Sequence, residues 1–65
     1  MEIVLNGQSR TVNASTVQEL LEELDSAGQR VAVERNRELV PRHLWRGTPI
    51  EPGDQIELVQ FVGGG

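Results

Sequence analysis

The first twelve residues have the pattern of a short antiparallel hairpin, with a mostly apolar run and a mostly polar run on either side of Asn6-Gly7. Ile3 and Leu5 fall on one face of an opening run that is rich in strand-forming side chains. Asn6 and Gly7 follow, and both accept a positive φ, which makes this pair the strongest short hairpin signal. We therefore predict that residues 8–12 return as the second strand.

A helical period of apolar residues follows the predicted hairpin. The apolar positions recur at the spacing of one helix face, at Val17, Leu20, Leu21 and Leu24. Ser15 is a good N-cap, and Gln18 three residues later completes a capping box. Gly28 is placed to end the helix as its C′ residue. The pattern predicts one amphipathic helix from about residue 16 to about residue 27.

Shorter apolar segments follow the helix. Residues 31–34 are mostly apolar, as in an interior strand. A polar turn separates them from a brief apolar segment, which Pro41 ends because proline has no N–H for a ladder. We expect residues 42–45 to form one helical turn, with Leu44 and Trp45 covering the core.

The last strand is the longest, over residues 55–62, and a turn with Pro-Gly chemistry precedes it. Its alternation places Ile56 and Leu58 on one face and Val59 and Phe61 on the other. The helix acts as a crossover between the first strand and the last. We therefore expect the last strand to lie centrally in the sheet, beside the first strand and parallel to it.

This order of elements predicts an α+β fold, a mixed sheet of four to five strands with one main helix on one face. The arrangement is the β-grasp, or ubiquitin-like, roll. We assign residues 1–62 to a single domain and residues 63–65 to a flexible C-terminal tail of three glycines.

The candidate functional group is the carboxylate at the end of that glycine tail. Glycine has no Cβ, and three extended residues span about 10 Å, so Gly63 and Gly64 can thread into a slot that excludes other side chains. They would deliver the α-carboxylate of Gly65 into that slot. The alternative is that the glycines are a linker remnant or a frayed end, and the tail alone does not decide between the two.

Composition narrows the function further. The chain of 65 residues has no cysteine, one histidine and a formal charge of −4, with arginine as its only basic residue apart from that histidine. These features argue against a thiolate nucleophile, a metal site and general nucleic-acid binding. So short a chain has no room for a deep catalytic cleft, and no apolar run reaches membrane-span length. We expect a cytoplasmic binding or carrier module with no catalytic residues of its own, contacting neither nucleic acid nor membrane.

The segments together, in order and spacing, resemble the ThiS family, the sulfur carriers of bacterial thiamine (thiazole) biosynthesis. The resemblance covers the whole chain. It rests on Asn6-Gly7, the helix over 15–24, residues 31–36, Val40-Pro41-Arg42-x-x-Trp45, Pro52-Gly53-Asp54 and Phe61-Val62-Gly63-Gly64-Gly65.

The resemblance implies that the chain is a carrier on which partner enzymes act. A ubiquitin-activating-type adenylyltransferase would use ATP to adenylate Gly65. The adenylate would become a thiocarboxylate, with sulfur from a cysteine desulfurase or sulfurtransferase, and thiazole synthase would receive that sulfur. The chain would bind no cofactor itself. Chemistry agrees, because a carboxylate with a pKa of roughly 3.3–3.7 is ionised at pH 7 and needs a leaving group before sulfur can attack.

Partner contacts are expected near the root of the tail. Phe61, Val62 and Val59 form an apolar patch that we interpret as a docking surface, although ordinary packing against a neighbouring segment is the alternative for Val59. Four arginines, at positions 35, 37, 42 and 46, form a local basic cluster that we interpret as a solvated face. His43 is expected on the surface without a functional role.

Other functions stay open at this point. Carriers for tRNA thiolation and the small subunit of molybdopterin synthase belong to the same class. A ubiquitin-like modifier would instead join its tail to a lysine of another protein. An inert β-grasp interaction module, whose glycines do nothing, is the third possibility.

Overall fold

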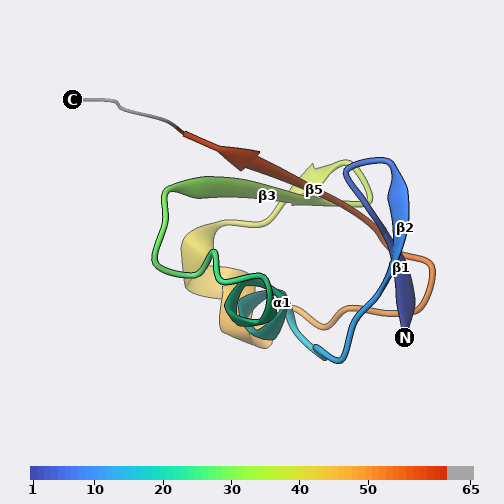
Figure 1. Ribbon diagram of the computed structural model, residues 1–65. Coiled ribbons are helices and arrows are strands. Elements are labelled where there is room, and N and C mark those ends of the chain that lie inside the picture. Colours follow the sequence, from blue (N-terminus) through green and yellow to red (C-terminus); the bar gives the residue numbers. More distant parts are fainter. Residues whose placement is uncertain (62–65) are drawn as a thin grey trace.

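The computed structural model describes residues 1–61 and contains a five-stranded mixed sheet with the order β2-β1-β5-β3-β4 (Figure 1). The main helix and a 3-10 helix lie on the same side of this sheet. The elements are β1 (Glu2–Leu5), β2 (Gln8–Thr11), α1 (Val17–Glu23), β3 (Val31–Arg35), β4 (Glu38–Leu39), η1 (Arg42–Gly47) and β5 (Gln55–Gln60). The predicted β-grasp layout is therefore confirmed.

The opening hairpin has the predicted strands and turn. Asn6 and Gly7 have φ values of 49° and 82°, so both occupy the left-handed region that a tight two-residue turn requires. Leu5 pairs with Gln8 directly across this turn. The positive φ at both positions explains why the Asn-Gly pair stands there.

The central position of β5 is also confirmed. β5 runs parallel to β1 on one side, where Leu5 pairs with Ile56, and antiparallel to β3 on the other. The pairing with β3 is much longer and extends from Ile56 to Gln60. β5 thus extends beyond its pairing with β1 and continues alongside β3. Its C-terminal end therefore lies at the end of the sheet that is away from the β1–β5 pairing (Figure 1).

The helix begins one residue later than the sequence pattern indicates. Thr16, not Ser15, is the N-cap, and its hydroxyl accepts a hydrogen bond of 3.1 Å from the N–H of Glu19. The Glu19 carboxylate in turn accepts from the N–H of Ser15 at 2.8 Å. Glu19 takes the part expected of Gln18 because it stands three residues after the N-cap Thr16, although its carboxylate accepts from the residue before the N-cap.

The predicted C-terminal end of the helix is wrong by several residues. The helix ends at Glu23, and Asp25 adopts the positive φ of 59° expected of Gly28. The N–H of Ser26 donates to the carbonyl of Leu21 at 2.7 Å. The N–H of Asp25 donates to the carbonyl of Glu22 at 3.0 Å. These two bonds form a Schellman cap, so local hydrogen bonding stops the helix before glycine is reached.

One core lies between the sheet and the helices. Its buried apolar side chains come from β1, β3, β5, both helices and the connecting segments, and include Ile3, Val12, Val17, Leu20, Leu21, Val33, Trp45 and Ile56. Trp45 is buried as predicted, and its indole N–H donates to the carbonyl of Val40 at 2.9 Å. Leu44 does not cover the core as predicted. It is 48% exposed, because the 3-10 turn directs only one of the two neighbours inward.

Candidate functional site

The candidate site is the C-terminal end of β5, from which the tail continues. Phe61 is the last described residue, and its N–H donates to the carbonyl of Arg30 at 2.9 Å. Phe61 is 59% exposed and Val59 is 55% exposed, so neither side chain packs into the core. The predicted outward orientation of both residues is confirmed. Val62, Gly63, Gly64 and Gly65 lie outside the described residues.

The exposed apolar surface is larger than the sequence indicates. Val59 pairs with Ala32 across the β3–β5 ladder, and Leu39 pairs with Glu34 across the β3–β4 ladder. Because directly opposed residues share a face of the sheet, Leu39 lies on the same outer face as Val59. Leu39 is 64% exposed. Its contribution was missed because β4 has only two residues, too few for an alternation to show in the sequence.

A surface groove of about 400 Å³ lies beside the end of β5. Its walls come from the start of β3, from the segment after β4 and from Phe61, and they are mostly apolar. Two arginines, Arg30 and Arg42, also border the groove. The guanidinium carbon of Arg42 lies 5.4 Å from the centroid of the Trp45 ring, within the range of a cation–π interaction.

The interpretation of the arginine cluster as a solvated face is wrong for Arg35. Its Nε donates to Asp54 Oδ2 at 2.7 Å, and the Arg35 side chain is 28% exposed. Arg37, Arg42 and Arg46 are exposed. Arg35 is therefore a structural residue that joins the end of β3 to the turn before β5.

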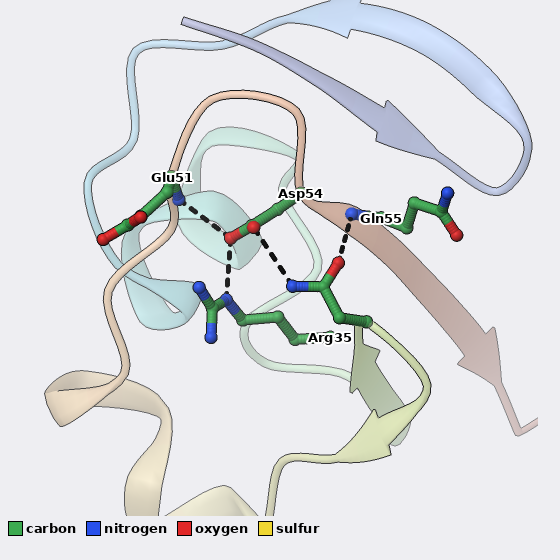
Figure 2. Close-up of polar contacts among 5 residues, drawn as sticks. Arg35, Glu51, Asp54 and Gln55 are labelled. Atoms are coloured by element: carbon green, nitrogen blue, oxygen red, sulfur yellow. Dashed lines mark hydrogen bonds and ion pairs between the residues drawn. The ribbon is translucent and has the colours of Figure 1, made fainter.

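Asp54 is the centre of a polar cluster that sequence reasoning did not identify (Figure 2). Its carboxylate accepts from the N–H of Glu51 at 2.8 Å, from Arg35 and from the amide of Asn36 at 3.1 Å. Asn36 Oδ1 then accepts from the N–H of Gln55 at 2.9 Å. These bonds fix the start of β5 relative to the β3–β4 turn, where Asn36 has a φ of 52°.

The pKa of the Asp54 carboxyl reflects two opposed influences. Burial by itself raises this pKa, whereas the hydrogen bonds from Glu51, Asn36 and Arg35 and the charge of Arg35 lower it. The net effect is a pKa below the ordinary value of 3.8. Asp54 is thus held as a carboxylate at neutral pH, where it serves the fold and lies outside the groove.

No group of three or more potential metal-ligating side chains is found within residues 1–61. His43 is exposed, as expected. None of the helices in the described part of the chain is long and apolar enough to cross a membrane.

The model of a family described as the ThiS family matches residues 3–65 of the chain. The match includes the terminal glycines as well as the folded part of the chain.

Individual relatives agree with this match. A sulfur carrier protein ThiS of Escherichia coli (strain K12) is 41% identical, and the alignment covers all of both chains. A thiazole synthase of Paramagnetospirillum magneticum is 46% identical over the whole of this chain, which spans only 20% of that relative's length. The crystal structure of a thiamine biosynthesis protein (ThiS) from Geobacter metallireducens superposes with a TM-score of 0.85 at 36% identity, covering all of both chains.

Proposed function

The chain belongs to the ThiS family, and from that premise we propose that it carries sulfur for thiamine biosynthesis on the carboxyl group of Gly65. The observation that carries the proposal is the exposure of the residues at the C-terminal end of β5. β5 runs past the end of β1 and ends at Gln60, at one end of the sheet (Figure 1). Phe61 follows it and is 59% exposed. The last described residues before the glycine tail therefore lie outside the core.

The chemistry is a two-step activation of that carboxylate. An adenylyltransferase of the ubiquitin-activating type joins a carboxylate oxygen of Gly65 to the α-phosphate of ATP, and pyrophosphate leaves. A persulfide on the sulfur donor then attacks the carbonyl carbon and AMP leaves, which joins the donor and Gly65 through an acyl disulfide. A thiol attacks the donor's sulfur in this disulfide, so that the S–S bond breaks, the thiocarboxylate leaves, and the donor cysteine and the thiol become a disulfide. The donor is a cysteine desulfurase or a sulfurtransferase. A glycine at the end leaves the carbonyl carbon open to attack, because it has no side chain.

Thiazole synthase is the proposed acceptor of the sulfur. Two relatives named thiazole synthase, from Paramagnetospirillum magneticum and Magnetococcus marinus, contain a segment that matches all of this chain at 46% and 44% identity. This occurrence within one polypeptide supports a working relationship between the carrier fold and that enzyme. The exposed residues Val59 and Phe61 would form part of the contact.

The protein would therefore act as a co-substrate, with its chemistry supplied by enzymes that hold the tail. Asp54, the most buried carboxylate of the described chain, forms hydrogen bonds within the fold and is given no part in this chemistry. We place this activity in the cytoplasm, where ATP is available to the activating enzyme.

A reconstituted sulfur-transfer reaction tests the proposal. The assay combines the protein with the activating enzyme, ATP, a cysteine desulfurase with cysteine, and thiazole synthase with its small substrates. The full chain should support thiazole formation, and a chain that lacks Gly65 should not, although its thermal unfolding midpoint should stay nearly unchanged. Equal thiazole formation by the two chains would contradict the proposal, and a large loss of stability would assign the tail a structural role.

A further inference from the structure

β3 has an uncovered edge beside the root of the tail. β4 pairs only with Glu34 and Arg35, and one further hydrogen bond of 2.8 Å joins the N–H of Val40 to the carbonyl of Val33. After β4 the chain leaves the sheet and passes to η1, which begins at Arg42 (Figure 1). The first residues of β3 thus have a neighbouring strand on the β5 side only.

The pattern of hydrogen bonds shows which backbone groups face that open edge. The carbonyl of Arg30 accepts from Phe61 on the β5 side, whereas the carbonyl of Val33 accepts on the β4 side. Because successive residues of a strand direct their backbone groups to opposite sides, the N–H and C=O of Val31 face the same side as those of Val33. No strand of the described chain pairs with Val31 there. Such an edge is a template for an added strand.

The groove that borders this edge has a defined chemical character. Its wall is apolar, with Val31, Val40, Pro41 and Trp45 among the lining residues. Its only charged lining residues are Arg30 and Arg42, and neither forms an ion pair within residues 1–61. In a chain of net charge −4, this is a positively charged site with an apolar floor.

We propose that this groove binds an extended, apolar segment of the sulfur-accepting enzyme, and that a carboxylate of this segment meets Arg30 and Arg42. The bound segment would pair with the backbone of Val31 as an added strand. The occupant follows from charge complementarity and from position. Phe61 itself lines the groove, so the groove adjoins the start of the segment that the enzyme must reach. The inference rests on the proposed function, with thiazole synthase as the enzyme concerned.

The test measures binding to purified thiazole synthase by titration calorimetry. The variant carries Arg30→Gln and Arg42→Gln together, and the matched control carries Arg10→Gln, which removes an exposed arginine from β2 at the opposite edge of the sheet. We expect the double variant to bind at least about tenfold more weakly and the control to bind within about twofold of the unchanged protein. Thermal melts verify that each variant is folded.

Amide hydrogen exchange of the unchanged protein provides a second measurement that needs no variant. The Val31 amide should exchange at least about tenfold more slowly in the complex, because it gains a strand partner. The proposal is overturned if the double variant binds as the control does, if Val31 exchange is unaffected by the enzyme, or if the unchanged protein does not bind the enzyme. None of these outcomes bears on whether Gly65 takes up sulfur, which the intact mass of the chain decides separately.

Discussion

The side-chain oxygen of Asn6 accepts a hydrogen bond of 2.8 Å from the backbone N–H of Leu58, although the two residues are 52 positions apart in the chain. The N–H of Asn6 also donates to the carbonyl of Ile56 at 2.9 Å. The turn of the first hairpin therefore continues the short β1–β5 pairing beyond Leu5. It anchors the central strand partway along its course to the root of the tail.

Replacement of Asn6 by glycine should separate the two roles of this residue. Asn6→Gly accepts the φ of 49° but lacks the side-chain oxygen, so the bond to Leu58 is lost. We expect unfolding to become easier by about 0.5–1.5 kcal/mol, measured by urea denaturation, and the Leu58 amide to exchange faster. Asn6→Asp keeps an acceptor oxygen and serves as the control. Unchanged exchange at Leu58 in Asn6→Gly would contradict this interpretation.

Removal of the Asp54 carboxylate should destabilise the fold. Asp54→Ala leaves the N–H of Glu51 and the side chains of Arg35 and Asn36 without their shared acceptor. We expect a loss of about 1–3 kcal/mol in the free energy of unfolding. The control is Glu51→Ala, which removes an exposed carboxylate of the same turn but keeps the backbone N–H, and which should change stability by no more than about 0.5 kcal/mol. Similar effects of both substitutions would refute the role assigned to Asp54.

The stability of the protein should depend on the charge of Asp54 at acid pH. Its pKa in the folded protein lies below the ordinary 3.8, so the unfolded chain takes up the proton first as the pH falls. The stabilisation from Asp54 is thus fully present above about pH 5 and is lost as the pH drops through the folded-state pKa. Asp54→Asn should flatten the acid limb of the stability curve, measured by urea titration at each pH. An unaltered limb would show that other carboxylates determine it.

Substitution of Phe61 should weaken partner binding with little effect on stability. The side chain is 59% exposed, so Phe61→Ala removes little from the core. We expect about tenfold weaker binding to the activating enzyme or to thiazole synthase, measured by calorimetry, since exposed aromatic residues are frequent anchors of interfaces. Leu44→Ala is the matched control, because Leu44 is a 48% exposed apolar residue on η1. Equal binding by Phe61→Ala and Leu44→Ala would argue against the docking surface.

The sequence was sufficient for the fold because its strongest signals are local. The Asn6-Gly7 turn, the stripe from Val17 to Leu24 and the alternation of β5 each involve neighbouring residues, and each is found in the structure. The helix boundaries were less accurate. At each end of the helix, neighbouring residues are equally suitable as caps by sequence. Only the hydrogen bonds in the folded structure identify Thr16 as the N-cap and Asp25 as the C′ residue.

The site was predictable in its apolar part only. The outward direction of Val59 and Phe61 follows from the period of two residues in a strand. The contributions of Leu39, the groove and the Arg35–Asp54 pair depend on which strands are neighbours, because Arg35 and Asp54 are 19 positions apart. An isolated Asp after Pro-Gly gives no sign that it will be buried. The burial of Asp54 is therefore seen only in the structure.

The intact mass of the chain after incubation with the activating enzyme, ATP and a sulfur source tests the central claim most directly. Our account predicts a mass increase equal to the exchange of one oxygen for sulfur, confined by fragmentation to Gly65 and absent when ATP is omitted. A chain whose mass stays unchanged with active enzymes would contradict it, and so would a tail found joined to lysines of other proteins.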